Sequence, residues 1–259
     1  MSRKIMTEVK NMRIAFIGSG KVATELALIF QFKGLHISGI SSRNQETGKE
    51  LADKLNCPFE ENPNSLHADL IIVATNDDSV YELDQQLDAK QWLAYTAGAV
   101  DLHQLSGGNW GVFYPLQTFT KGRHLGIDEI PLLIEAKDPI LSKILAEICL
   151  HVGFQFEHCS TDERQKYHLA AVFVNNFVNH LLHRAQVQLK ESSLNWHLLS
   201  PLLEETIAKL DDYSAFDAQT GPARRSDQRT IETHLSMLSE TDQSVYSLLT
   251  KSILKSYQK

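Results

Sequence analysis

Residues 12–23 read MRIAFIGSGKVA, and this stretch predicts how the first half of the chain folds. The apolar run at residues 13–17 is typical of a buried parallel strand. Gly18, Gly20 and Ala23 follow at the G-x-G-x-x-G/A spacing of a dinucleotide-binding turn. The first glycine permits a tight turn, the second lets the backbone approach a pyrophosphate, and the alanine keeps the next helix close to the sheet.

A helix is expected directly after this turn. From Val22 onward apolar residues recur at helical spacing, and Gly34 is a natural C-terminal stop. The free N–H groups at the start of such a helix form an anion site, so we expect them to face the ligand. The predicted contacts of the turn with a dinucleotide are Gly18, Ser19, Gly20, Lys21, Val22 and Ala23.

The end of the second predicted strand, residues 36–41, indicates which dinucleotide binds. An NAD enzyme usually carries an Asp or Glu there for the ribose, whereas this chain carries Ser41, Ser42 and Arg43. Hydroxyls and a guanidinium donate hydrogen bonds to a 2′-phosphate, which favours NADP over NAD. Alternatively, Ser42 caps the next helix in a capping box with Gln45 while Arg43 is solvated, and both interpretations can hold together.

The remaining cofactor contacts are expected at the carboxyl ends of three later strands, near residues 69–74, 92–95 and 110–114. In a doubly wound sheet these ends lie at the edge where the ligand binds. The predicted contacts are Ala74, Thr75, Asn76, Thr96, Gly98, Pro115 and Gln117.

Composition excludes several functional classes. The 259 residues carry a net charge of −7 and no basic cluster, which argues against nucleic-acid binding. Three widely spaced cysteines form neither a disulfide framework nor a metal pattern, so we expect no metal and a cytoplasmic location. Residues 1–11 read as a flexible extension without a signal sequence, and the uncharged stretch 167–183 contains too many Asn and His residues to span a membrane.

Two domains are expected. Strand and helix patterns alternate over residues 12–158, which predicts an α/β fold with a Rossmann-type, doubly wound, mostly parallel sheet. Its last short strands are expected at residues 130–134 and, as an edge strand, 154–156. No convincing strand follows, so residues 159–259 form an all-helical domain. Its helices are expected at about 162–190, 197–213, 226–238 and 241–257.

The first of these helices has a polar stripe of His168, Asn175 and Asn179 that includes the small residue Ala171, whereas the opposite positions are apolar. A helix that is apolar around most of its circumference needs partners on several sides, and a second subunit would supply them. We therefore expect a homodimer formed through the C-terminal helices. His168 and Asn175 either serve the substrate or form a satisfied hydrogen-bond pair in the core.

Several motifs resemble a known family. They are residues 14–23, PLQTF at 115–119, YHLAAVFVNN at 167–176, TGPARRSD at 220–227 and His234-Leu235. Together they resemble bacterial proteins with a Rossmann-like domain and a C-terminal helical domain of unknown function (DUF2520 type), related to the pyrroline-5-carboxylate reductase and deazaflavin-dependent NADP reductase group. The resemblance implies a Rossmann fold, a helical dimerisation domain and NADP binding, but no particular substrate.

Two departures narrow the activity. Hydroxyacid dehydrogenases and ketopantoate reductases of this fold use a Lys-x-x-x-Asn pair. Here the residue four positions after Lys166 is Ala170 and not an asparagine, so the catalytic lysine of these enzymes is not evident. The Ser-Pro-Gly-Gly turn of a pyrroline-5-carboxylate reductase is replaced by Thr-Gly-Pro at residues 220–222. Both specific activities are therefore disfavoured.

The predicted function is NADP-dependent hydride transfer to or from a small carbonyl or imine metabolite. His168 is the candidate general acid, Asn175 an orienting donor, and Arg225 a carboxylate clamp acting within or across subunits. For the last region the alternative is a helix cap made by Ser226 or Asp227. The alternative function is a non-catalytic NADP-binding sensor; a plain dimerisation scaffold is less expected because the phosphate-binding turn is intact.

Overall fold

The computed structural model describes residues 9–87, 90–107 and 109–257, and the side chain of residue 191 is not described. The chain divides into two compact units, residues 1–176 and 177–259. Of the expected N-terminal extension, residues 1–8 lie outside the described part, while Val9 is buried in the core of the first unit.

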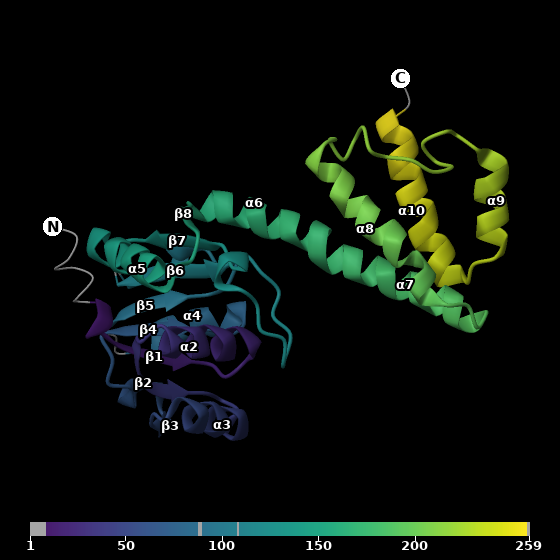
Figure 1. The fold of residues 1–259 in the computed structure, drawn as a ribbon. Coiled ribbons are helices and arrows are strands. Elements are labelled where there is room, and N and C mark those ends of the chain that lie inside the picture. Colours follow the sequence, from purple (N-terminus) through teal and green to yellow (C-terminus); the bar gives the residue numbers. More distant parts are fainter. Residues whose placement is uncertain (1–8, 88–89, 108, 258–259) are drawn as a thin grey trace. The chain divides into compact units, whose positions relative to one another are not determined.

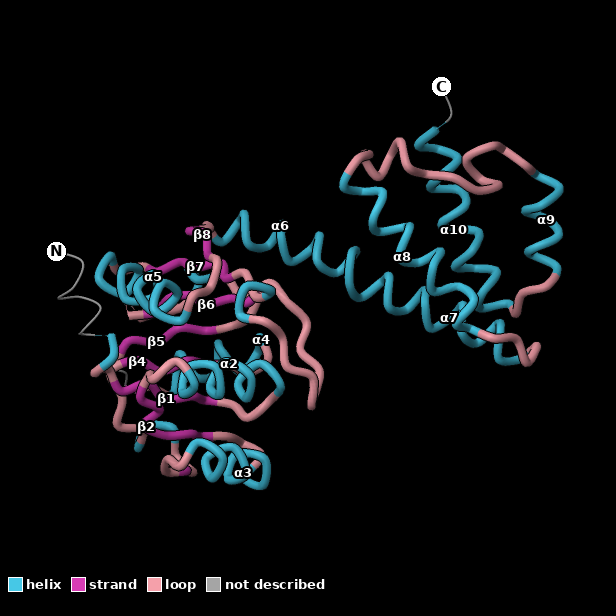
Figure 2. The backbone as a smooth tube through the Cα atoms, in the orientation of Figure 1, coloured by secondary structure: helices cyan, strands magenta, loops and turns pink. Residues whose placement is uncertain are grey.

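The first unit contains an eight-stranded sheet in the order β3-β2-β1-β4-β5-β6-β7-β8 (Figures 1 and 2). Neighbouring strands are parallel except for β6 and β7, which are antiparallel. The expected doubly wound, mostly parallel sheet is therefore confirmed. The strands are β1 (Arg13–Ile17), β2 (His36–Ser41), β3 (Phe59–Glu60), β4 (Leu70–Val73), β5 (Trp92–Tyr95), β6 (Trp110–Pro115), β7 (Leu132–Ala136) and β8 (Phe156–His158).

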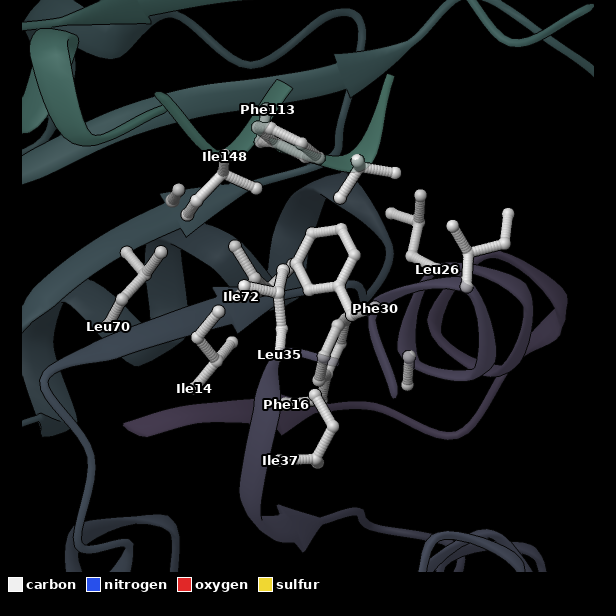
Figure 3. Close-up of a cluster of buried hydrophobic side chains, with 14 of the residues drawn as sticks. Ile14, Phe16, Leu26, Phe30, Leu35, Ile37, Leu70, Ile72, Phe113 and Ile148 are labelled. Carbon is white, nitrogen blue, oxygen red and sulfur yellow. The ribbon is translucent and has the colours of Figure 1, made fainter. Parts of the chain in front are cut away.

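Helices cover both faces of this sheet. One face packs against α2 (Lys21–Phe32), α3 (Gln45–Leu55) and α5 (Pro139–Val152), and the other against α4 (Asp77–Gln86). In the first of these cores Phe30 lies between Phe16 and Phe113, with 5.8 Å between ring centroids in each pair (Figure 3). Full burial of such side chains stabilises the unit by about 1.5–3 kcal/mol each.

The structure differs from the expected strands at three places. The strand expected at residues 130–134 begins later, at Leu132, because Ile130 first closes a 3₁₀ turn formed by Ile127–Glu129. The edge strand expected at residues 154–156 is likewise displaced, to β8. The two-residue β3 was not expected, since so short a strand has no alternation pattern to detect.

The helix α6 (Thr161–Ala171) leads out of the sheet region. Ser160 caps it, and Glu163 completes the capping box, as the sequence Ser-Thr-Asp at residues 160–162 indicates. A π-helix, Val172–Phe177, follows directly. The expected helix at 162–190 is therefore present but interrupted, because one wider turn replaces its α-helical hydrogen bonds.

The described part of the second unit consists of helices and connecting loops, without a strand. Its helices are α7 (Val178–Glu191), α8 (Ser200–Ala208), α9 (Gln228–Ser236) and α10 (Glu240–Tyr257). Arg184 of α7 binds both carboxylate oxygens of Asp242 of α10, at 2.6 and 2.7 Å. These bonds lower the pKa of the Asp242 carboxyl to about 2. Within the described residues no helix is both long and apolar enough to cross a bilayer.

Candidate functional site

The turn after β1 has the geometry of a phosphate-binding loop. Gly18 has a φ of +113°, and its N–H donates to the carbonyl of Ser41 at 2.7 Å. A Cβ at this position would lie 2.3 Å from the carbonyl oxygen of Ala74, so only glycine fits. By contrast, a Cβ added at Gly20, the N-cap of α2, would meet nothing within 4 Å. The first turn of α2 therefore opens onto free space, as an anion site requires.

A cleft of about 1340 Å³ lies over this turn. All its lining residues belong to the first unit. The predicted contacts that line it are Gly18, Ser19, Gly20, Lys21, Val22, Ser41, Ser42, Arg43, Ala74, Thr75, Asn76, Thr96, Gly98, Pro115 and Gln117, together with His168 and Asn175. Ala23, in the first turn of α2, is instead fully buried, and its small side chain keeps the helix close to the sheet.

Three hydroxyl groups meet where the second strand ends. Ser19 Oγ lies 2.8 Å from Ser42 Oγ and 2.7 Å from Thr47 Oγ1. The capping box expected for Ser42 and Gln45 is wrong, because Asn44 caps α3 by accepting a hydrogen bond from the Thr47 N–H at 3.1 Å. Three residues, 42–44, separate the end of β2 from the start of α3, and Ser42 among them lines the cleft.

Arg43 stands beside this hydroxyl cluster. Its guanidinium lies 3.8 Å from Glu82, and the two side chains are 74% and 60% exposed. Exposed pairs of this kind contribute about 0–1 kcal/mol, so a bound phosphate would compete for Arg43 at little cost. Thr47 and Glu82 also line the cleft, but neither position carries a motif in the sequence that would have indicated it.

At another part of the cleft a tyrosine and a histidine meet. A hydrogen bond of 3.0 Å joins the Tyr114 hydroxyl to His168 Nδ1. A Cβ at Gly98 would lie 2.4 Å from that nitrogen and 3.0 Å from Tyr114 Cζ, so the pair fits because residue 98 is glycine. The alternative of a buried His168–Asn175 pair is wrong, because the Asn175 side chain is exposed and His168 bonds to Tyr114.

Tyr114 was not among the site residues predicted from the sequence. The only signal was its place directly before Pro115, at the carboxyl end of a strand. Burial is the largest cause that raises the pKa of its phenol; Arg164 opposes the shift, and Asp77 adds to it. The hydroxyl therefore keeps its proton at neutral pH.

The position of α6 depends on one fully buried arginine. Arg164 is 0% exposed and donates to Glu135 of β7, to the Tyr95 hydroxyl at 3.1 Å and to the carbonyl of Val100. Thr161 adds its N–H to Glu135 at 3.1 Å. Since Arg164 precedes His168 by four residues, both lie on the same face of the helix.

The remaining catalytic candidate lies in the second unit. Arg225 is exposed and precedes Ser226, which has a φ of +56°. Asp227 caps α9 by accepting a hydrogen bond from the Thr230 N–H at 3.1 Å, so the helix-cap interpretation is confirmed for Asp227. A carboxylate clamp at Arg225 stays a prediction.

Comparisons with known proteins agree with this architecture. Residues 13–94 match the family described as "NADP oxidoreductase coenzyme F420-dependent", and residues 130–253 match a domain of unknown function, DUF2520. A "putative NADP oxidoreductase" from Bacteroides fragilis is 34% identical, with a TM-score of 0.88 and coverage of 95% of this chain and 99% of its own. No curated protein matches significantly.

More distant structures share the fold. An imine reductase from Myxococcus stipitatus, in complex with NADP⁺, is 17% identical, with a TM-score of 0.70 and coverage of 94% of this chain and 93% of its own. A 1-pyrroline-5-carboxylate reductase from Streptococcus pyogenes is also 17% identical, with a TM-score of 0.57 and coverage of 94% and 98%.

Proposed function

Because the chain belongs to the family of the Bacteroides fragilis NADP oxidoreductase-type protein, with its Rossmann-like domain followed by DUF2520, we propose that it is an NADP-dependent oxidoreductase. Its reaction is hydride transfer between NADP(H) and a small carbonyl or imine metabolite. The imine reductase neighbour, solved with NADP⁺, supports the same class of chemistry.

The observation that carries this proposal is the joint geometry of the glycine turn and the hydroxyl cluster. The turn aims the N-terminus of the twelve-residue helix α2 into the cleft, as a pyrophosphate requires. The hydroxyls of Ser19, Ser42 and Thr47 and the guanidinium of Arg43 lie about the next strand end, where a 2′-phosphate would accept hydrogen bonds.

The preference for NADP is tested at Arg43. A charge-assisted hydrogen bond contributes about 1.5–3 kcal/mol, so Arg43→Ala should weaken NADPH binding by roughly 10- to 150-fold. NADH binding should change by less than about threefold, because NADH lacks the phosphate. Calorimetric titration with both coenzymes measures the difference.

The matched control is Lys54→Ala, which removes an exposed positive charge from the last turn of α3, outside the cleft lining. It should leave both affinities unchanged. Equal losses of NADPH and NADH affinity in Arg43→Ala would show that the side chain does not recognise the 2′-phosphate.

Bound nicotinamide supplies the hydride, so the protein must supply orientation and a proton. We assign proton donation to His168, orientation of the substrate to Asn175, and a carboxylate contact to Arg225. The cleft position of His168 and Asn175 supports their part of this assignment. Arg225 requires its own test, with a carboxylate-bearing substrate.

We also propose that the chain is a homodimer through its C-terminal helices. The helix that begins at α6 carries exposed apolar side chains, including Leu169 at 60% and Val174 at 73%. Exposed apolar surface of this kind on an α-helix and its continuation favours burial against a second copy.

A further inference from the structure

We propose that Tyr114 and His168 act as one proton-donating pair, in which the Tyr114 hydroxyl gives its proton to the substrate and His168 Nδ1–H replaces it. This inference rests on the proposed reductase function and refines it: His168 supplies its proton to the substrate through a further catalytic residue, Tyr114, and not directly. The observation behind it is the 3.0 Å hydrogen bond between the two side chains inside the cleft.

The fold brings Tyr114 and His168 together from two elements that are far apart in the sequence. Tyr114 lies at the carboxyl end of β6, and His168 lies on α6, 54 residues later. The two rings meet edge to face, with 5.9 Å between their centroids and an interplanar angle of 71°. The empty Cβ position of Gly98 lies 2.4 Å from the histidine nitrogen, so any side chain there would separate the rings.

The charges around Tyr114 suit a proton donor. Burial keeps the phenol neutral, so a proton is available on the hydroxyl. The buried guanidinium of Arg164 on α6 opposes that effect and would stabilise the phenolate as it forms, while Asp77 on α4 acts in the opposite sense. Glu135 on β7 forms an ion pair with Arg164.

The step balances as follows. The substrate carbon gains a hydride from the reduced nicotinamide, and the electron pair of the C=O or C=N bond moves to the oxygen or nitrogen. That atom takes the proton of the Tyr114 hydroxyl, and the cationic imidazole of His168 passes its Nδ1 proton to the phenolate oxygen. The products are the alcohol or amine, the oxidised nicotinamide and neutral His168, which regains a proton from water.

The hydrogen bond is tested first in the protein without coenzyme. In ¹⁵N-histidine-labelled protein at pH 6, the His168 Nδ1–H proton should be visible because the Tyr114 oxygen accepts it. Tyr114→Phe keeps the ring but removes the acceptor, so this resonance should broaden through solvent exchange. His168→Gln identifies the signal among the 11 histidines of the chain.

Tyr81→Phe is the matched control, since its hydroxyl accepts from the Asp101 N–H outside the cleft lining. It should leave the His168 signal unchanged. An unprotonated Nδ1, or a signal that is the same in Tyr114→Phe and the wild type, would overturn the proposal without touching the NADP assignment.

Turnover is tested second, with NADPH and a panel of small cyclic imines, ketones and aldehydes. Tyr114→Phe should lower kcat by about 10²–10⁴-fold, the usual contribution of general acid catalysis, with NADPH affinity changed less than threefold. His168→Gln should lose a similar factor, and the double variant little more, because the two residues act as a unit.

The results of these experiments distinguish failure of the proton-donating pair from failure of the reductase function. Full activity of Tyr114→Phe, or additive losses in the double variant, would overturn the pair while leaving the reductase function standing. A wild-type protein that binds NADPH yet reduces no member of the panel would contradict both the pair and the proposed reaction, and would favour the sensor function.

Discussion

At the scale of single residues, two glycines determine the geometry of the cleft. Gly18 gives the chain a backbone conformation that other residues rarely adopt and leaves room for the carbonyl of Ala74. Gly98 leaves room for two side chains instead, those of Tyr114 and His168. The first requirement is readable in the sequence as a spacing, whereas the second depends on a contact between distant elements.

Gly18→Ala should therefore destabilise the protein and abolish tight NADPH binding. A non-glycine residue in this conformation costs about 1–3 kcal/mol, and the clash with Ala74 adds to that cost because the blocking atom is backbone. The unfolding temperature should fall by roughly 2–4 °C per kcal/mol in a chain of this size. Thermal unfolding and coenzyme titration measure both effects.

Gly34→Ala is the control, because Gly34 also has a positive φ, +77°, but a Cβ there meets nothing within 4 Å. It should lose only the conformational part of the stability and keep coenzyme affinity. Similar coenzyme losses in the two variants would show that close packing of the Gly18 turn is not what the ligand needs.

At the scale of elements, α6 is fixed to the sheet by a buried ion pair. Arg164 and Glu135 are hydrogen-bonded to each other and to groups from β5, the following loop and α6 itself. Removing one partner of such a pair leaves a buried charge uncompensated, which costs about 3–5 kcal/mol. The Nε atom of Arg164 has no hydrogen-bond partner, and burying such an unsatisfied donor costs about 1–3 kcal/mol, which offsets part of the stabilisation by the network.

Arg164→Ala should thus lower the free energy of unfolding by about 3–5 kcal/mol, as measured by urea denaturation. Lys166→Ala removes an exposed cation from the same helix and should change stability by less than about 0.5 kcal/mol. If the two variants lost the same small amount, α6 would owe its position to other contacts.

Elements whose ends carry local chemistry could be predicted from the sequence. The helix α5 begins after Asp138, which caps it, and ends at Gly153, whose φ is +94°. The strands β1, β2 and β5 were expected at their observed bounds, because apolar runs end there in glycine or polar residues. The π-helix could not be predicted, since its residues, VFVNNF, suit an α-helix equally well.

The candidate site, too, could be predicted only in part from the sequence. Contacts with a dinucleotide follow a motif, so the turn and strand ends were expected in the cleft and lie there. The hydroxyl partner Thr47 and the phenol of Tyr114 were not, because each enters through a contact between elements far apart in the sequence.

At the scale of the whole molecule, the predicted homodimer depends on the exposed apolar side chains of α6. Leu169→Lys places a charge on a residue that is 60% exposed in the single chain. If this surface is buried between two copies, the unpaired charge should shift the equilibrium to monomer. Sedimentation equilibrium should give twice the mass of one chain for the wild type and one mass for the variant.

Leu150→Lys is the matched control, because Leu150 is similarly exposed, at 62%, but lies on α5. It should leave the mass unchanged. A monomeric wild type, or a dimer insensitive to Leu169→Lys, would rule out this helix as the contact.

The antiparallel direction of β7 determines at which end of the sheet the chain enters α6. β7 is antiparallel to β6, and β8 is parallel to β7. His158, the last residue of β8, therefore pairs with Ile134, two residues away from the carboxyl edge of the sheet at Pro115. From there about two turns of α6 pass Ala99, whose carbonyl accepts a hydrogen bond from Gln165, and place the imidazole of His168 beside Tyr114 at the carboxyl edge. If β7 and β8 ran parallel to β6, α6 would begin at the carboxyl edge of the sheet. His168, about two turns further along the helix, would then lie too far from this edge to reach the Tyr114 hydroxyl.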